Sequence, residues 1–523
     1  MLGKKLSELR IANHMTQDAV ADKLNVSRQT VQKWERGAAL PTLDKLIRLT
    51  GLFHITLDSL CRDVKYGADF SGRIGEELLP NYSSIDEWEL WSKALTIEYR
   101  QCSDEGKAVE NYKELFEAIN RLPATAEKEK MCDALFSLIS KLPDVPGYPY
   151  FEPNDIETIR AERKEYKLSL KEYELDNKLL GGWYGRICGC LLGKPVEGIH
   201  SNELKVLCKA SKNYPLKKYI FKNDLPEDIE GIIQFPISKR AYPIDLGYMP
   251  FDDDTNYMVM ALHLLKKFGR DFSSKNVAEI WLSSQPKTAY YTAEKIAYMN
   301  LVNGFLPPDS ACYKNAYREW IGAQIRGDVF GYINPCDPET AAEMAWRDAR
   351  ISHIKNGIYG EMWVSAMIAL AYGTDDMLSI IRGGLAQIPS KSRLYNAVES
   401  ICSDYESGVE KEACFSNIAK RWNEANVHDW CHTISNAEIV TAALLYGKGD
   451  YGKSICLAVE QGFDTDCNGA TVGSVLGVVL GYEKIPAEWT SVINDTLETT
   501  ICGYNTVSVK KMAEETKAFC LLK

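Results

Sequence analysis

The chain has 523 residues, of which 45% are hydrophobic and 25% are charged, proportions typical of a globular protein and unlike those of a disordered one. At this length we expect about three structural units. The net charge of −11 is uneven: residues 1–62 hold ten Lys and Arg against six Asp and Glu, a balance of +4, which leaves −15 for the remainder. We therefore expect only the first segment to meet a polyanion.

No apolar signal-peptide core is present in the N-terminal stretch MLGKKLSELRIANHM, and no run of about 18 uninterrupted apolar residues predicts a membrane helix. These features indicate a cytoplasmic protein without a membrane partner. The 15 cysteines are an odd number scattered along the chain, which is typical of reduced thiols. The pairs Cys188/Cys190 and Cys431/His432 lack zinc spacing, so we expect them to pack structurally.

Residues 15–37, MTQDAVADKLNVSRQTVQKWERG, predict two short helices joined by a tight turn. Thr16 is placed to cap the first helix and Ser27 to cap the second. Val31 and Trp34 fall on the inward face of the second helix, which we expect to end at Gly37. This arrangement is typical of a helix-turn-helix unit.

The same stretch, together with the P....L..L spacing that follows it, resembles the XRE or phage-repressor-like family across about sixty residues. The resemblance implies a five-helix DNA-binding domain over residues 1–63, with residues 27–36 as the recognition helix in the major groove. It also implies that Gln17 contacts a backbone phosphate and that the recognition contacts come from Arg28, Gln29 and Lys33. The alternative is a helical module that docks on another protein.

Residues 66–141 carry amphipathic helical patterns such as SIDEWELWSKALTIEYRQ, with Trp88, Trp91 and Leu95 on one side. No catalytic constellation is found there. The proline-dense stretch LPDVPGYPYFEP, residues 142–153, is incompatible with a helix interior and predicts a boundary. We therefore expect a helical connector over residues 64–153. Its helices could pair two chains in a homodimer, or form a rigid spacer packed on the C-terminal domain.

Two later segments place a glycine at every fourth residue. GGWYGRICGCLLGKPVEG does so at 181, 185, 189 and 193, and GFDTDCNGATVGSVLGVVLG at 469, 473, 477 and 481. Each glycine inside a helix costs about 1 kcal/mol relative to alanine, so such a stripe predicts the close approach of another backbone. The two helices could pack against each other or around a shared site.

Carboxylates stand at the starts of two predicted helices. Asp464 and Asp466 precede the second glycine stripe, and Asp252, Asp253 and Asp254 precede the apolar stretch TNYMVMALHLL. One acid is enough to cap a helix, and several at a tightly packed helix start repel one another unless they are exposed or bridged by a cation. The pattern therefore indicates a shared cation site.

Taken in order, a GxxxGxxLGxPxE motif, an acid cluster of the T/S-D-D-T kind and a GxDTD motif followed by glycines resemble the ADP-ribosylglycohydrolase family over about residues 175–495. The resemblance implies an orthogonally packed, all-helical domain over residues 154–523. It also implies two magnesium ions between helix starts, or manganese in their place, and hydrolysis of the glycosidic bond of an ADP-ribosyl group. With the N-terminal domain and the connector, the expected fold class is all-α.

The resemblance implies a metal site formed by five aspartates: Asp252, Asp253, Asp254, Asp464 and Asp466. Glu197 matches the loop glutamate that orients the sugar, and either Asp253 or Asp464 is expected to accept the proton of the attacking water. The chain departs from the family pattern at two positions. Asp252 stands where the family usually has Thr or Ser. Cys467 stands where the family has a Thr or Ser metal ligand, and a thiol suits magnesium poorly.

The segment EWIGAQIRGDVFGYINP is similar to the family's GNGAxMRxxPxG segment, which lines the diphosphate and the ribose. From this and the nearby Ser/Thr-His position of relatives, the resemblance implies substrate contacts from Gly322, Gln324, Arg326, Asp328 and His353. Arg326 could equally be a buried salt-bridge partner, and His353 a structural histidine. Tyr290 and Tyr291 could stack on adenine or belong to the core.

Two functions follow from these features. The first is a magnesium-dependent hydrolase of an ADP-ribosylated protein, nucleic acid or small molecule, tethered to DNA by its N-terminal domain. The second is a transcriptional regulator whose glycohydrolase-like domain senses ADP-ribose or a related nucleotide without turnover. The retained acids favour turnover, whereas Cys467 favours sensing. The expected partners are DNA and an ADP-ribosylated substrate.

Overall fold

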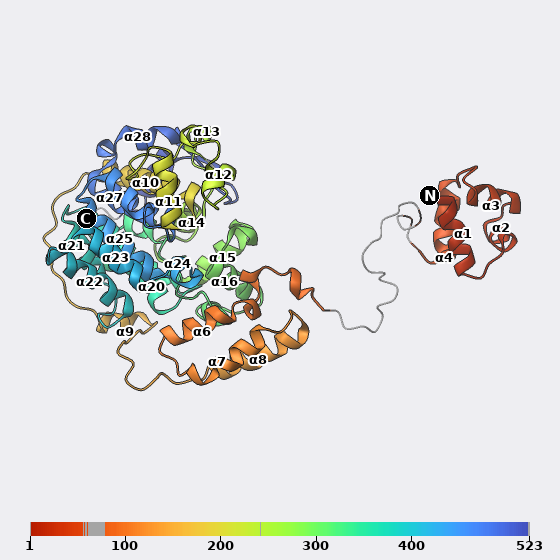
Figure 1. Ribbon diagram of the computed structural model, residues 1–523, viewed down its shortest axis with the longest axis horizontal. Helices are drawn as coiled ribbons and strands as arrows, with labels where there is room; N and C mark the ends of the chain where they lie inside the picture. The colour runs from red at the N-terminus through yellow and green to blue at the C-terminus, as the bar shows by residue number, and fades with distance from the viewer. Residues whose placement is uncertain (1, 56, 58–59, 61–78, 241, 521–523) are drawn as a thin grey trace. The chain divides into compact units, whose positions relative to one another are not determined.

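The computed structural model describes residues 2–55, 57, 60, 79–240 and 242–520 (Figure 1). The chain divides into two compact units, Met1–Pro80 and Asn81–Lys523. Regular structure in the described residues is almost entirely helical, and the sheet found there pairs β1 (Thr496–Glu498) antiparallel with β2 (Thr506–Ser508), Thr496 facing Ser508. The predicted all-α fold class is confirmed. None of the described helices is long and apolar enough to cross a membrane.

The first unit contains α1 (Leu2–Ala12), α2 (Gln17–Leu24), α3 (Arg28–Glu35) and α4 (Leu43–Phe53). The two predicted caps are present: the Thr16 hydroxyl accepts the Ala19 N–H at 3.1 Å and the Ser27 hydroxyl accepts the Thr30 N–H at 3.2 Å. The core of this unit includes Leu6, Val20, Leu24, Val31, Trp34, Leu49 and Phe53. The residues after Ile55, where a fifth helix would follow, lie largely outside the described residues.

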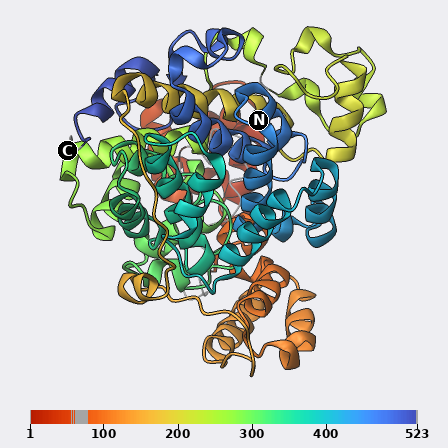
Figure 2. The same cartoon turned by 90° about the vertical axis from the view of Figure 1, so that its left-hand side faces the viewer.

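The predicted connector helices belong to the second unit. Three short 3-10 turns, η2 (Tyr82–Ser84), η3 (Glu87–Glu89) and η4 (Trp91–Lys93), lead into α6 (Leu95–Asp104), η5 (Glu110–Tyr112), α7 (Lys113–Asn120) and α8 (Ala126–Ile139). Trp91, Leu95, Cys102 and Phe116 share one hydrophobic core with the rest of this unit, and Figure 2 shows these orange helices along one edge of it. Of the two arrangements considered for these helices, the described unit shows packing on the C-terminal domain.

The rest of the second unit is a helical bundle with two small β-strands. Its helices are α9 (Ile156–Ala161), α10 (Leu175–Gly193), η6 (Lys194–Val196), α11 (Ser201–Ala210), η7 (Lys222–Asp224), α12 (Ile229–Ile232), η8 (Ile237–Lys239), α13 (Pro243–Leu246), α14 (Asp253–Phe268), α15 (Ser274–Ser284), η9 (Lys287–Ala289), α16 (Thr292–Val302), α17 (Asp309–Cys312), α18 (Asp328–Tyr332), α19 (Pro338–Ala349), α20 (Lys355–Ala371), α21 (Met377–Leu385), α22 (Arg393–Glu406), α23 (Lys411–Arg421), α24 (Val427–Cys431), α25 (Thr433–Gly447), α26 (Tyr451–Val459), α27 (Thr465–Leu480), η10 (Tyr482–Lys484), α28 (Ala487–Thr490), η11 (Ser491–Ile493) and α29 (Val509–Lys517). Helices α20, α25 and α27 are buried on all faces and form its centre.

The two glycine stripes face each other. A Cβ placed on Gly189 would overlap the carbonyl of Gly469, and one on Gly185 would overlap the carbonyl of Gly473. Gly181 meets Gly477 in the same way, so α10 and α27 run antiparallel with their backbones in contact. The helix propensity lost at each glycine is the cost of this approach, and the contact aligns the two helices residue by residue.

Candidate active site and DNA-binding surface

The last turn of α10 lies against the first turn of α27. Gly193 has no Cβ and packs directly on the backbone of Thr465, whose hydroxyl donates to the Gly193 carbonyl at 3.0 Å. The turn η6 follows at once, and Lys194 and Glu197 line the same cleft as Asp464 and Asp466. The glycine contact therefore brings the acids of the last motif to the end of the first.

A buried arginine inside the glycine-striped helix fixes the third acidic segment. Arg186 lies on α10 with its side chain 0% exposed, 2.6 Å from Asp254 at the start of α14 and 2.9 Å from Asp328 at the start of α18. It also donates to the main-chain carbonyls of Asp254 and Ile325. The other Asp254 oxygen accepts the Cys467 thiol at 3.2 Å. Both carboxylate oxygens of Asp254 therefore have partners within the protein.

The acids from three segments converge on one site. The ligand atoms of Asp252, Asp254, Asp466 and Cys190 lie within 4.8 Å of one another, as do those of Asp464, Asp466 and Cys467. Asp252 caps α14 by accepting the Asp254 N–H at 3.0 Å, and its second oxygen accepts the Lys194 ammonium at 2.6 Å. Asp252, Asp254, Asp464 and Asp466 thus lie together, and Asp253 lines the same cleft as Asp464 and Asp466.

Carboxylates outnumber cations at this site, and their pKa values reflect it. Burial, reinforced by the neighbouring carboxylates, raises the pKa of Asp253 and Asp464 well above their usual range. The pKa of Asp466 rises to about 6 through burial and the Asp252 charge. The pKa of Glu197 rises to about 8, mainly because of the Asp466 charge and then burial. Asp252 is the exception: burial opposes its charge, but Lys194 outweighs this and lowers its pKa.

These residues line a cleft of about 420 Å³, within the roughly 300–1,000 Å³ range of ligand pockets. Its acidic lining comprises Glu197, Asp252, Asp253, Glu294, Asp464 and Asp466. Its aromatic lining comprises Trp88, Phe251, Tyr291, Trp320 and Trp430. An acidic centre beside aromatic walls suits a polar sugar attached to a planar ring.

The predicted substrate-binding residues divide between the cleft and the layer behind it. Gly322 lines the cleft. The other four are buried and bonded within the protein, outside the described cleft lining. Gln324 accepts the Thr433 hydroxyl at 2.9 Å, Arg326 pairs with Glu294 at 2.8 Å and with Asp348, and Ser352 hydrogen-bonds to His353 at 2.8 Å. Asp328 pairs with Arg186. Of the two alternatives for Arg326, the structure shows the buried salt bridge.

Several cleft residues escaped the sequence analysis. Lys194 stands between Gly193 and Pro195 in the quoted motif. A single positive charge so close to predicted metal ligands could have indicated that this residue lies in the cleft. Glu294 and Trp320 carry no local signal, since only the tertiary fold brings them to the cleft. Of the predicted tyrosine pair, Tyr290 is buried and donates to the Trp281 carbonyl, whereas Tyr291 is 39% exposed and lines the cleft.

Comparison with known proteins identifies the larger unit. A family model described as ADP-ribosylglycohydrolase matches residues 171–516, more than half of the chain. The chain belongs to the ADP-ribosylglycohydrolase family. A second family model, described as helix-turn-helix, matches residues 6–60 of this glycohydrolase-family protein.

Similar proteins match its N-terminal part. Over 57 residues it is 37% identical to the HTH-type transcriptional activator BcrR of Enterococcus faecalis, and over 58 residues 33% identical to the cryptic phage CTXphi transcriptional repressor RstR of Vibrio cholerae. Each match covers 11% of this chain, and 28% and 52% of the two relatives, less than two thirds of either. A solved structure described as an ADP-ribosylglycohydrolase-related protein complex is 16% identical, with a TM-score of 0.42, over 66% of this chain and 99% of that one.

The family implies divalent metal ions, and the residues of the glycohydrolase cleft fit them. Among the described residues, no Lys or Arg forms an ion pair with Asp253, Asp464 or Asp466, and Asp466 Oδ1 is buried without a hydrogen-bond partner. Oxygen donors in excess of nearby positive charge suit a hard divalent cation. Burial raises the pKa of the Cys190 and Cys467 thiols, which keeps them protonated and unsuited as ligands.

In the helix-turn-helix unit, the side chains predicted to make the recognition contacts with DNA are exposed to solvent. Arg28, Gln29 and Lys33 on α3 are exposed, and Arg28 lies 3.7 Å from the exposed Asp18. Gln17 is half-buried and donates to Glu35 at 2.8 Å. Since Glu35 also accepts Arg10 at 2.6 Å, this group joins α1, α2 and α3.

We predict that metal affinity of the full-length protein rises with pH. At pH 6 the Glu197 carboxyl, with a pKa of about 8, holds a proton that a bound cation must displace. The Mn²⁺ association constant should therefore rise at least about tenfold between pH 6 and pH 8, with proton release measured by calorimetry in two buffers. Without metal, the free energy of unfolding should fall as pH rises from the ordinary carboxyl range toward 8, because the folded state then holds protons that the unfolded state has lost.

Two variants make this measurement specific. The double variant Asp464→Asn and Asp466→Asn should bind no Mn²⁺ at either pH. Asp271→Asn, which removes an exposed carboxylate outside the cleft lining, should behave as the wild type. An affinity independent of pH, or unchanged in the double variant, would show that the cleft acids do not hold the ion.

Proposed function

We propose that this protein hydrolyses the glycosidic bond of an ADP-ribosyl group with divalent metal ions, and that it is tethered to specific DNA sites by its first unit. The observation that carries the proposal is the excess of buried and half-buried carboxylates around one cleft in a glycohydrolase-family domain. A cleft so rich in negative charge favours a reaction that develops positive charge on a sugar ring.

Asp253, Asp464 and Asp466 are proposed to hold the ions directly, since no Lys or Arg among the described residues forms an ion pair with them. Asp252 and Asp254 are proposed to complete the metal site. Lys194 pairs with Asp252, and Arg186 pairs with Asp254. Magnesium is the expected cation, with manganese as a substitute. When bound, two such ions would supply a template for the ribose hydroxyls and a water of lowered pKa.

The protein's own groups are proposed to orient the sugar and accept the proton. Glu197 is half-buried in the cleft wall, where its carboxylate, deprotonated once a cation is bound, would accept a hydrogen bond from a ribose hydroxyl. A carboxylate oxygen of Asp253 or Asp464 would accept the proton of the attacking water. Both remain candidates, because both line the cleft and both have raised pKa values.

Sensing without turnover is the second candidate function, and one contact favours it. The Lys194 ammonium lies 2.6 Å from Asp252, so the protein supplies one cation of its own where a metal ion would otherwise bind. A domain of this kind would bind ADP-ribose and report its presence to the DNA-binding unit.

Hydrolysis is tested by incubating the full-length protein and Mg²⁺ with ADP-ribosylated protein and ADP-ribosylated DNA, and measuring released ADP-ribose. We expect release from at least one substrate, lost by about a hundredfold or more in Asp464→Asn and abolished by chelation. Asp271→Asn should retain wild-type rates. Binding of ADP-ribose with no release from either conjugate would support sensing and refute hydrolysis of these two classes.

DNA reading is tested by selecting binding sites from random DNA with the purified protein. Arg28 and Gln29 are proposed to contact base edges, and Lys33 is proposed to contact a phosphate. Gln17 is proposed to contact the phosphate backbone of the DNA. Gln29→Ala should change the enriched sequence, whereas Lys33→Ala should weaken all sites and lower the salt slope by about one. Lys113→Ala, an exposed lysine of the second unit, is the control. Selection that enriches no sequence would favour a docking role for this unit.

A further inference from the structure

The segment between the two family matches supplies part of the cleft wall. Trp88 on η3 lines the cleft, although the glycohydrolase-family match begins only at residue 171. Its indole is half-buried and meets the ring of Tyr291 edge to face, with centroids 5.8 Å apart and planes at 81°. The two rings therefore form a corner of the cleft, built from segments about two hundred residues apart.

Ionic contacts hold this corner in place. Glu89, next to Trp88, accepts the Lys287 ammonium at 2.6 Å and lies 3.9 Å from Lys295. The Lys295 ammonium lies 5.5 Å from the centre of the Trp88 ring and 5.9 Å from that of Tyr291. A cation over both rings adds to their packing, so Trp88 is fixed against the body of the unit.

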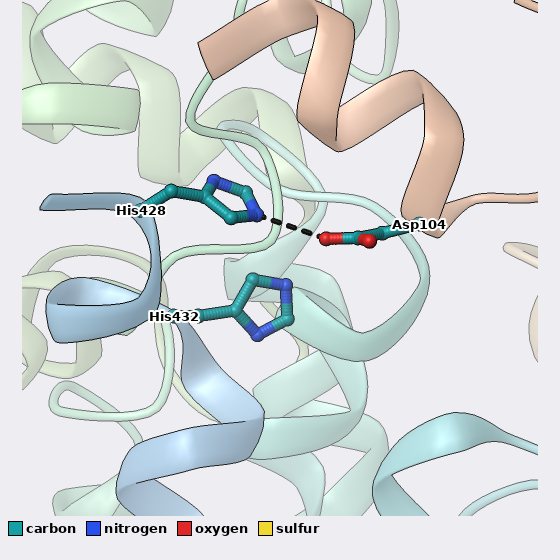
Figure 3. Close-up of side chains that lie close together, drawn as sticks. All are labelled: Asp104, His428 and His432. Atoms are coloured by element: carbon teal, nitrogen blue, oxygen red, sulfur yellow. Dashed lines mark hydrogen bonds and ion pairs between the residues drawn. The ribbon is translucent and has the colours of Figure 1, made fainter. Parts of the chain in front are cut away.

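The helix that follows Trp88 fixes the inner wall of the cleft. Three consecutive residues that lead into that wall are connected to α6: Arg318 pairs with Glu98 at 2.9 Å, and Glu319 accepts Gln101 at 2.6 Å. The third, Trp320, donates its indole N–H to His428, which in turn donates to Asp104 at the end of α6 (Figure 3). All three contacts connect α6 to the strip that leads into Trp320 and Gly322 at the cleft.

Asp104, His428 and His432 lie close together: His428 is hydrogen-bonded to Asp104, and the His432 ring packs edge to face on that of His428, with centroids 5.1 Å apart. His428 Nδ1 accepts the Trp320 N–H at 3.1 Å, and His432 Nδ1 accepts the Ile434 N–H at 3.1 Å. Each neutral imidazole therefore carries its proton on Nε2, the atom with which it would have to ligate a metal ion. His428 and His432 flank Trp430 and Cys431 in the sequence, and these two residues line the cleft.

We propose that Trp88 is a substrate-binding residue, which packs against the planar base of the ADP-ribosyl group and thereby selects for a nucleotide. The proposal rests on the function proposed above and adds a specificity determinant from outside the family domain. A base is the planar part of such a substrate, and an aromatic corner with exposed edges matches it in shape and polarity. The acids that line the cleft are then left for the sugar.

The test measures binding of ADP-ribose and of ribose 5-phosphate, which lacks the base, to the full-length protein with Mg²⁺ by calorimetry. Trp88→Ala should weaken ADP-ribose binding by about 5- to 150-fold, the range for loss of one base–aromatic contact. Ribose 5-phosphate should bind wild type and variant equally. Trp88→Phe should restore ADP-ribose affinity to within about threefold of wild type, because it keeps a ring at this position.

Controls separate this proposal from a structural effect and from failure of the proposed function. Phe151→Ala removes a half-exposed aromatic of the same segment that is not among the described cleft residues, and should leave both affinities unchanged. Equal ADP-ribose affinity in wild type and Trp88→Ala, or an equal loss for both ligands, would overturn the role of Trp88 alone. A wild type that binds neither ligand would overturn the proposed function as well.

Discussion

Backbone contact between α10 and α27 determines where Lys194, Glu197, Asp464 and Asp466 lie. The carbonyl of Gly469 occupies the space that a side chain at position 189 would need, and the same holds for the pairs 185/473 and 181/477. Close-packed backbones allow little sliding or rotation, so the end of one helix is fixed against the start of the other. Lys194 and Glu197 follow directly from α10, and Asp464 and Asp466 stand at the start of α27. The site is thus a consequence of the glycine contact.

The same contact gathers several carboxylates in one place, and positively charged side chains of the protein pair with only some of them. Arg186 and Lys194, both from the α10 segment, pair with Asp254 and Asp252 at the start of α14. These pairs hold the third segment in place, since removing one partner from a buried pair leaves an uncompensated charge. The remaining carboxylates have raised pKa values, and among the described residues no Lys or Arg forms an ion pair with them. An unsatisfied charge of this kind is typical of a functional site rather than of a stable core.

Local signals in the sequence predicted much of this arrangement. The caps at Thr16 and Ser27 are short-range hydrogen bonds that residue type alone indicates, and both are present. Glycines spaced by four predicted a close backbone approach, which the structure shows. Of the five aspartates predicted to share a site, Asp252, Asp254, Asp464 and Asp466 cluster, and Asp253 lines the same cleft. That the two stripes face each other was one of two open alternatives, because spacing gives the face of a helix but not its partner.

Long-range features could not be predicted in the same way. Arg326 and His353 lie behind the cleft, because their local pattern is equally compatible with a buried ion pair or a structural histidine and only packing decides between them. The amphipathic pattern around Trp88 predicted a helical segment with one apolar side but not the surface that it would cover. Its place in the cleft depends on contacts with residues about two hundred positions away, and no local signal encodes such a pairing.

The proposed metal site depends most on the glycine packing that places its acids. The most direct measurement is the Mn²⁺ affinity of Gly189→Ala by calorimetry, below its unfolding temperature, beside Gly231→Ala, whose Cβ would meet no atom within 4 Å. Overpacking of this kind costs about 1–3 kcal/mol and forces the backbones apart. We expect Gly189→Ala to bind Mn²⁺ at least about tenfold more weakly, because its added Cβ separates Lys194 and Glu197 from Asp464 and Asp466, while Gly231→Ala binds as the wild type. Wild-type Mn²⁺ affinity in folded Gly189→Ala would show that the glycine contact does not place the metal-binding acids.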